Sequence, residues 1–334
     1  MRETTVRSNA MRERWRAIAR KVPGRVLDVG LRGLSRVAML HPQANPDRYG
    51  VVVTRDVPYG PDPIHRMDIY RPRTATGDAA PVIYLHGGGF RILSKDTHWG
   101  MALALAHRGH TVFVPDYRLA PAHPFPAAPE DACRATLWVV EHAREHGADP
   151  ARLVLAGESA GANLSLVVAI ARSWRRPEPF ARAVFDADIA LAGVLPACGF
   201  LQVSTPEHRG TVGWMLERMR QISHDYLPHA VSDEARELAD VVTFLERAPA
   251  PLHPLPPMFA IVGGGDPVRR DTERLTPAWT RHGAEGAHKV YGDSHHAFHA
   301  FLWRPMAREA WADQHEFLDR VLAATKPEPR RATR

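Results

Sequence analysis

Ser159 stands between two glycines, Gly157 and Gly161, where an apolar stretch gives way to a helical pattern. The apolar stretch, residues 153–156, is typical of a buried strand, and the residues after 161 place apolar side chains at helical spacing. A serine at the apex of such a tight turn projects from the backbone, where a substrate and a base can reach its hydroxyl. The pattern therefore predicts a serine nucleophile.

A serine hydroxyl needs a base to take its proton, and the base works best when a carboxylate orients it. In an open parallel sheet, reacting groups gather at the carboxyl ends of strands, so the partners of Ser159 are expected just after later strands. Asp266 follows the apolar stretch 258–262, and three histidines follow a short strand predicted at 288–291. The resulting chain order is serine, aspartate, histidine.

Both partners have competitors. Asp271 is a second carboxylate after the same strand, but it falls inside the predicted helix, which favours Asp266. The histidines are His295, His296 and His299, and periodicity alone does not choose among them. A metal site is poorly supported, because no acidic or cysteine ligands recur at ligand spacing.

His86 and the glycines after it, Gly87–Gly89, follow another apolar stretch. The charge that develops on a carbonyl oxygen during attack must meet preorganised donors. Consecutive glycines let backbone N–H groups turn toward that oxygen without interfering side chains. We therefore expect the N–H groups of Gly88, Gly89 and Ala160 to form an oxyanion hole.

The chain around these residues alternates between strand and helix patterns. Period-two alternation over residues 51–70 predicts a hairpin, and apolar runs separated by helical patterns predict parallel strands from residue 81 onward. Residues 197–250 lose this alternation and are expected to be helical. The sequence predicts one α/β domain with a mostly parallel sheet, helices on both faces and a helical excursion.

The net charge of +6 is unevenly distributed over the 334 residues. Residues 1–37 and 326–334 contribute +7 and +3, which leaves −4 for the remainder of the chain. Because the basicity is confined to the ends and no nucleic-acid-binding motif accompanies it, no nucleic-acid partner is expected. The basic, amphipathic stretch 11–40 predicts helices that either pack on the body or bind an anionic membrane surface.

The two cysteines, Cys133 and Cys198, form no metal or disulfide pattern, which suits a reducing compartment. No apolar run reaches membrane-spanning length, and the N-terminus lacks the features of a signal peptide. We therefore expect a cytoplasmic protein.

Together, these motifs resemble those of the hormone-sensitive-lipase-like family of α/β-hydrolases, the bacterial family IV carboxylesterases. The resemblance covers about residues 50–320. The stretches that carry it occur in the family's order and spacing: His86–Phe90, Asp116–Pro121, His123–Pro126, Gly157–Gly161 with Asn163 and Leu164, Asp266 with Pro267, and His296–Phe298.

The resemblance implies an α/β-hydrolase fold with a helical cap, built from the N-terminal helices and from an insertion after the sixth strand. The expected organisation is an N-terminal arm and cap at 1–48, a hydrolase core at 49–196 and 251–325, a cap insertion at 197–250 and a basic tail at 326–334. These boundaries assign the helical excursion to the cap.

The resemblance also bears on individual residues. In the family the catalytic histidine precedes a glycine-phenylalanine pair, which favours His296 as the base, with His295 second. Glu158 stands where the family usually has aspartate or threonine, and Ala297 stands where it usually has glycine. The side chains that would line an acyl pocket, or else form the cap's own core, are Phe90, Trp214, Met215, Met219 and Tyr226.

The resulting prediction is a serine carboxylesterase that hydrolyses short- to medium-chain esters through an acyl-enzyme. Ser159 is the nucleophile, His296 the base and Asp266 the orienting acid, with no cofactor and no metal. The same groups would serve an amide, formamide or lactone hydrolase, and a relative without turnover would only bind its ligand. The last strand is an edge strand in this family, which favours a homodimer.

Overall fold

The structure is a computed structural model that describes residues 24–75, 77–209, 213–228 and 230–325. Its centre is an eight-stranded sheet in the order β1-β2-β4-β3-β5-β6-β7-β8. β1 pairs with β2, and β2 with β4, in antiparallel fashion, whereas all later neighbours are parallel. The strands are β1 (Val51–Pro58), β2 (Arg66–Pro72), β3 (Pro81–Leu85), β4 (Thr111–Pro115), β5 (Leu153–Glu158), β6 (Leu191–Ala197), β7 (Met258–Gly263) and β8 (Gly286–Tyr291). The predicted mostly parallel sheet with a hairpin at its front is confirmed.

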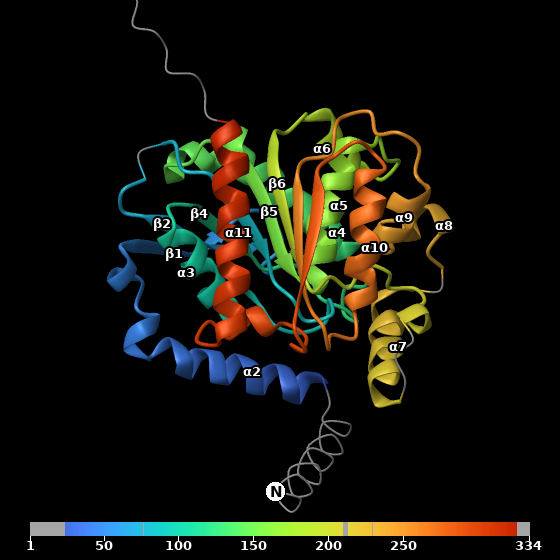
Figure 1. The fold of residues 1–334 in the computed structure, drawn as a ribbon, viewed down its shortest axis with the longest axis horizontal. Coiled ribbons are helices and arrows are strands. Elements are labelled where there is room, and N and C mark those ends of the chain that lie inside the picture. The colour runs from blue at the N-terminus through green and yellow to red at the C-terminus, as the bar shows by residue number, and fades with distance from the viewer. Residues whose placement is uncertain (1–23, 76, 210–212, 229, 326–334) are drawn as a thin grey trace, which may run out of the picture.

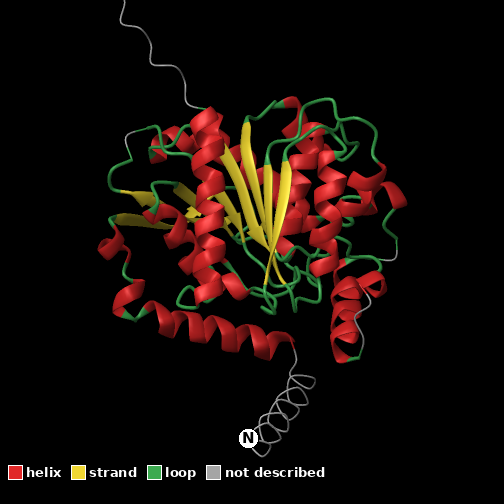
Figure 2. Cartoon of the chain, viewed as in Figure 1, coloured by secondary structure: helices red, strands yellow, loops and turns green. Residues whose placement is uncertain are grey.

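Helices cover both faces of this sheet, as predicted (Figure 1; Figure 2). One face packs against α3 (Trp99–His107) and α11 (Pro305–Ala324). The other face packs against α4 (Ala127–His142), α5 (Ala160–Ser173) and α10 (Arg269–Thr280), and α6 (Pro179–Asp186) packs in turn on α4 and α5. The central strands β3, β4 and β5 are buried along their whole length, which explains why their sequences are continuous apolar runs rather than alternating ones.

Two further helices lie at the lower edge of the molecule in Figure 1, where the parallel strands end. One is α2 (Gly24–Met39), whose Arg32 and Asp28 side chains bind the backbone carbonyl and N–H of Leu93. The other is α7 (Trp214–Tyr226), whose Ile222 side chain packs on Gly89. Both pieces of the predicted cap therefore contact the loop that follows β3.

The predicted cap insertion, 197–250, divides into two parts in the structure. Its helix α7 reaches the loop after β3, whereas α9 (Val241–Arg247) packs beside α5 and α10 and belongs to the main core. The short α8 (Asp233–Arg236) precedes it. Val241, Val242 and Leu245 are buried, so apolar burial ties this part to the hydrolase body. The outer arm, 1–23, and the basic tail, 326–334, lie outside the described residues.

Candidate active site

Ser159 occupies the turn between β5 and α5 in a strained backbone conformation, with φ 54° and ψ −111°. A positive φ is uncommon for a residue with a side chain and persists only where the surroundings enforce it. Here the Ser159 N–H donates to the Ala197 carbonyl at 2.8 Å, and the Phe200 N–H donates to the Ser159 carbonyl at 3.2 Å. The end of β6 and the chain after it thus hold the Ser159 turn in place through these two backbone hydrogen bonds.

The two glycines around Ser159 are required by close packing. A Cβ placed on Gly161 would lie 1.9 Å from the carbonyl oxygen of Leu85 at the end of β3. A Cβ on Gly157 would lie 2.4 Å from the backbone of Gly161. The spacing of glycines in the sequence is therefore explained by a turn pressed against the neighbouring strand.

Asp266 and His296 are in direct contact. His296 Nδ1 lies 3.0 and 2.9 Å from the two carboxylate oxygens of Asp266, whose side chain is fully buried. The Val268 N–H also donates to this carboxylate at 2.9 Å. Burial alone would lower the pKa of His296, but the charge and hydrogen bond of Asp266, with the charge of Glu158, raise it above the ordinary value of 6.5.

The competing carboxylate has another role. Asp271 is fully buried and accepts the N–H groups of Leu201 and Gln202 at 2.8 and 3.1 Å. It holds the chain that follows β6, and its hydrogen bonds satisfy backbone donors rather than an imidazole. The geometry therefore favours Asp266 as the partner of the base.

The three histidines are also separated by the structure. His295 is exposed and directs Nδ1 toward the carbonyl of His296. His299 is buried beside Glu158, with 3.4 Å between Nε2 and Oε2. Of the three, His296 is the one hydrogen-bonded to Asp266, and it leaves Nε2 for a proton from the nucleophile.

Ser159 Oγ makes no hydrogen bond to the described residues, so its contact with His296 stays a prediction. Catalytic hydrogen bonds are often long without substrate. Cys198 nevertheless connects the two parts of the site. It follows Ala197, which binds the Ser159 N–H, and its Sγ lies within 4.8 Å of ligand-type atoms of Asp266 and His296.

Cys198, Asp266 and His296 form the one group of three metal-type ligands in the described part of the chain. The carboxylate already accepts hydrogen bonds from His296 and from Val268. Burial, then the charges of Asp266 and Glu158, hold the pKa of the Cys198 thiol well above its ordinary value, which disfavours a thiolate ligand. These donors fit an acid–base pair better than a metal centre.

The glycine stretch after β3 forms a turn that a side chain would block. Gly88 and Gly89 have φ values of 114° and 59°, which favour glycine. A Cβ on Gly88 would lie 2.0 Å from the Ile92 carbonyl oxygen. In the described residues, the N–H groups of Gly88, Gly89 and Ala160 have no hydrogen-bond acceptor, so they are available to a ligand.

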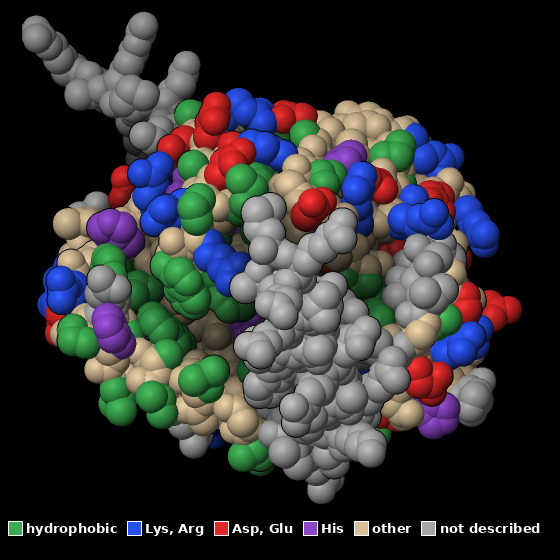
Figure 3. Space-filling model, turned by 60° about the horizontal axis from the view of Figure 1, so that its bottom comes forward, with side chains coloured by type: hydrophobic (Ala, Val, Ile, Leu, Met, Phe, Trp, Pro, Cys, Tyr) green, Lys and Arg blue, Asp and Glu red, His purple; other side chains and the backbone are tan. Residues whose placement is uncertain are grey.

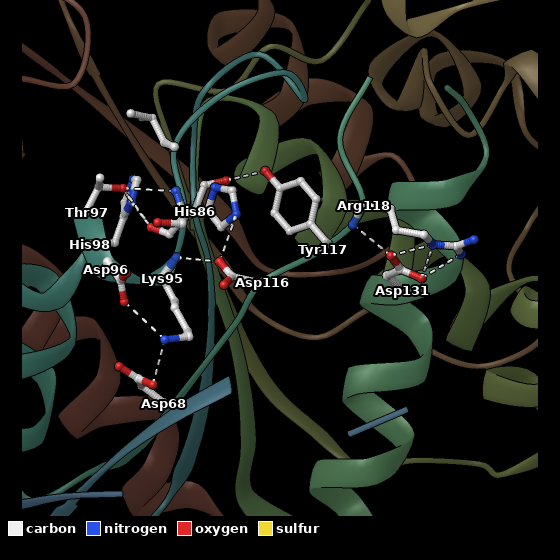
Figure 4. A network of polar contacts seen from close by, with 12 residues as sticks. Asp68, His86, Lys95, Asp96, Thr97, His98, Asp116, Tyr117, Arg118 and Asp131 are labelled. Carbon is white, nitrogen blue, oxygen red and sulfur yellow. Dashed lines mark hydrogen bonds and ion pairs between the residues drawn. The ribbon is translucent and has the colours of Figure 1, made fainter. Parts of the chain in front are cut away.

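A buried network, shown in Figure 4, supports this turn from behind. His86 Nδ1 donates to the Gly87 carbonyl at 2.8 Å, and the His86 ring stacks on Tyr117 with 4.1 Å between ring centres. The Tyr117 hydroxyl donates to the His86 carbonyl at 2.7 Å, and the Lys95 N–H donates to Asp116 at 2.7 Å. Burial, with the nearby His98, lowers the pKa of His86 to about 3, so this ring is neutral. The stretch 116–118 thus positions the predicted oxyanion hole.

The side chains predicted to line the substrate pocket differ in their burial and in what they contact. Phe90 and Tyr226 are fully buried and stack on each other with ring centres 3.8 Å apart, so they join the cap to the body as core residues. Met219 is also buried in that core, and Met215 packs against it half-buried. The side chain of Trp214 lies outside the described part of the chain. Phe90 and Tyr226 thus pack in the core of the molecule, and a role for these side chains in a substrate pocket stays a prediction.

Sequence reasoning missed the side chains grouped around Glu158. His98 contacts the Gly87 N–H, and Cys198 lies beside Asp266, but neither is part of a recognisable motif. His299 did have a signal, because it stands three residues after His296. The sequence marked Glu158 as a departure, without indicating its surroundings.

Comparisons with known proteins agree with this architecture. A family described as alpha/beta hydrolase fold matches residues 82–300. The chain is 32% identical over 220 residues to carboxylesterase NlhH of Mycobacterium tuberculosis, which covers 63% of this chain and 65% of that protein. It is 38% identical over 106 residues to hormone-sensitive lipase of Mus musculus, which covers 30% and 13%.

Among solved structures, esterase LipW from Mycobacterium marinum matches with a TM-score of 0.73 and 25% identity, over 89% of this chain and 90% of that one. The chain spans less than two thirds of the length of the curated relatives named here. The resemblance to hormone-sensitive-lipase-like enzymes is confirmed by these relatives. The chain therefore belongs to the α/β-hydrolase fold family.

Proposed function

We propose that this protein is a serine carboxylesterase that hydrolyses short- to medium-chain esters. The observation that carries the proposal is the hydrogen-bonded pair of Asp266 and His296, joined through the chain after β6 to a strained Ser159 turn. The relative NlhH is named a carboxylesterase, which supports the same activity.

In the proposed mechanism, Ser159 Oγ attacks the ester carbonyl carbon while its proton moves to His296 Nε2. The carbonyl oxygen becomes an oxyanion that accepts the N–H groups of Gly88, Gly89 and Ala160. His296 then donates its proton to the leaving alcohol oxygen, and an acyl-serine remains. Water, deprotonated by His296, then attacks the acyl carbon; the bond to Ser159 Oγ breaks, His296 returns the proton to that oxygen, and the acid is released. Throughout, Asp266 orients the ring and stabilises its positive charge.

The proposal is tested with a series of p-nitrophenyl esters from acetate to dodecanoate and with the anilide that matches the best ester. We expect hydrolysis to be fastest for short to medium acyl chains and the anilide to be much slower. A faster anilide would favour the alternative of an amide hydrolase with the same triad, and formamide or lactone substrates extend the same comparison. A protein that binds these compounds without turnover would be a ligand-binding relative.

We also propose that α2 touches an anionic membrane surface. Asp28, Arg32 and Ser35 bind the body through Leu93 and Asp96, so the polar face of the helix points inward. Hydrophobic side chains are exposed on the face of the molecule shown in Figure 3. The most exposed side chains in and directly after α2 are Val29, Leu34, Val37 and Leu40. Exposed apolar side chains, combined with a basic sequence over residues 1–37, are features of helices that bind membrane surfaces.

No helix in the described residues is long and apolar enough to cross a membrane. The contact proposed for α2 is therefore peripheral. A cytoplasmic location and a homodimer are further proposals, and β8, at one edge of the sheet, is the strand that would pair between subunits. Sedimentation of the purified protein tests the homodimer.

A further inference from the structure

Glu158, the last residue of β5, is a buried carboxylate beside the nucleophile, and the mechanism above does not use it. Its side chain is 7% exposed. A Cβ placed on Gly87 would lie 2.8 Å from Glu158 Oε1, so the carboxylate packs directly under the glycine turn. Glu158 thus precedes the nucleophile in the chain and packs against the turn that carries the predicted oxyanion hole.

His98 lies on one side of this carboxylate, with 3.9 Å between its Nε2 and Glu158 Oε1. This nitrogen accepts the Gly87 N–H at 3.1 Å and therefore carries no proton. The other nitrogen, Nδ1, faces Thr97 Oγ1 at 2.9 Å and the Ser94 carbonyl at 3.3 Å, so the proton is there. His98 thus binds the glycine turn and lies beside the Glu158 carboxylate.

His299 lies on the other side, with 3.4 Å between its Nε2 and Glu158 Oε2. Among the described residues, neither ring nitrogen of His299 nor Glu158 Oε2 has a hydrogen-bond partner. His299 belongs to a short 3-10 helix, Phe298–Ala300, which begins two residues after His296. The pair of Glu158 and His299 therefore bridges the nucleophile's strand and the loop that carries the base.

Glu158 is ionised in this environment. Burial would raise its pKa, but the nearby His98, with the charges of His299 and His296, lowers it to about 2. Burial lowers the pKa of His299 below its ordinary value, although the charge of Glu158 acts in the opposite direction. The charge is therefore present at every pH at which the base titrates.

The other titratable groups around Glu158 carry no charge that would cancel it. Burial raises the pKa of Tyr84, Tyr117 and Cys198 well above their ordinary values, so these groups stay protonated and neutral. His86 is neutral because burial lowers its pKa. Of the described groups that act on His296, Asp266 and Glu158 are the two anions.

We propose that Glu158 is a positioning residue that acts with Asp266 on His296. When Ser159 Oγ attacks, its proton moves to His296 Nε2 and the ring becomes a cation. Glu158, buried beside His299, stabilises this cation through space, and it neither gains nor loses a proton. The inference rests on the proposed esterase function, because it concerns the charge that the base acquires in that reaction.

The test is the pH profile of kcat/KM for p-nitrophenyl butyrate in Glu158→Gln. Because the variant removes an anion that favours the protonated ring, the midpoint of the acid limb should move about 0.5–1 pH unit lower than in the unmodified protein. The plateau of kcat should fall about three- to tenfold, by the same difference in stabilisation of the cation, while KM changes little. A residue with a merely structural role would lower the rate at all pH values and leave the midpoint in place.

Three further variants make the comparison specific. Glu158→Asp keeps the charge and should keep the midpoint. Asp293→Asn removes a charge three residues before His296, but this side chain is exposed, so solvent screens it and the midpoint should stay. Glu158→Thr is a second neutral variant, for use if Glu158→Gln unfolds, and it should shift the midpoint in the same direction.

The results separate this inference from the proposed function. If the unmodified protein hydrolyses the ester but both neutral variants at position 158 share the midpoint of Asp293→Asn, the role of Glu158 is overturned. If the unmodified protein itself does not hydrolyse the ester series, it is the proposed esterase function that fails.

Discussion

The imidazole of His296 is surrounded by groups that hold a proton on it. Its pKa is raised above 6.5 because the negative charges of Asp266 and Glu158 outweigh the effect of burial. A base must be unprotonated to accept the proton of Ser159. Activity should therefore rise with pH through a midpoint above 6.5, and it should be lost as the pH falls through that midpoint.

Replacing Asp266 tests this relation at the residue scale. In Asp266→Asn the neighbouring negative charge is gone, so the pKa of His296 falls and the midpoint of kcat/KM moves to lower pH. At the same time kcat should drop about 10³–10⁴-fold, because the ring loses its orientation and the stabilisation of its cation. Stopped-flow or steady-state profiles from pH 5 to 9 measure both effects.

Asp271→Asn is the matched control for that variant. It removes a carboxylate after the same strand, but one that binds the backbone N–H groups of Leu201 and Gln202. It should lower the thermal stability and leave the pH midpoint unchanged. A shifted midpoint in Asp271→Asn, with none in Asp266→Asn, would reverse the assignment of the acid.

At the scale of elements, the loop that carries the base contains a strained residue. Ala297 has φ 56°, in the left-handed region, where the resembling family usually has glycine. For a residue with a Cβ this conformation costs conformational free energy. Glycine adopts it without that cost but loses more entropy on folding. Ala297→Gly should therefore stabilise the fold by about 0.5–1 kcal/mol. Denaturant unfolding measures this difference.

The control for Ala297→Gly is Ala300→Gly in the same loop. Ala300 is not among the residues with positive φ, so glycine gains nothing there and the variant should be less stable than the unmodified protein. Equal destabilisation by both substitutions would show that the conformation of Ala297 costs little.

The elements were largely predictable because their causes are local. Continuous apolar runs mark β3, β4 and β5, since both faces of these strands are covered. The division of the segment 197–250 was not predictable, because the packing of α9 on α5 and α10 depends on contacts that are distant in sequence. The side chains around Glu158 could not be predicted from the sequence for the same reason, since His98 and His299 come from two separate loops.

At the scale of the whole molecule, the outward apolar face of α2 predicts affinity for anionic vesicles. Val37 and Leu40 are 64% and 82% exposed, so Val37→Glu with Leu40→Glu should leave the fold intact and weaken vesicle binding at least about fivefold. Flotation with vesicles of phosphatidylglycerol and phosphatidylcholine measures the bound fraction.

Leu252→Glu is the control on another surface. This side chain is 68% exposed in the segment before β7, where the Leu252 N–H donates to the Ser173 carbonyl at the end of α5, and its substitution should not change vesicle binding. If the α2 variant floats as well as the unmodified protein, the apolar face does not bind membranes. Loss of binding in the Leu252 variant alone would place the contact elsewhere.

The central claim is that Ser159 is the nucleophile of an esterase, and labelling with diethyl p-nitrophenyl phosphate tests it most directly. Attack by Ser159 Oγ should release one equivalent of p-nitrophenol, leave one diethylphosphoryl group on the peptide that contains Ser159, and abolish hydrolysis of p-nitrophenyl butyrate. Ser159→Ala should take up no label and lose at least about a thousandfold in activity. A label on another residue, or a Ser159→Ala protein with undiminished activity, would contradict the account.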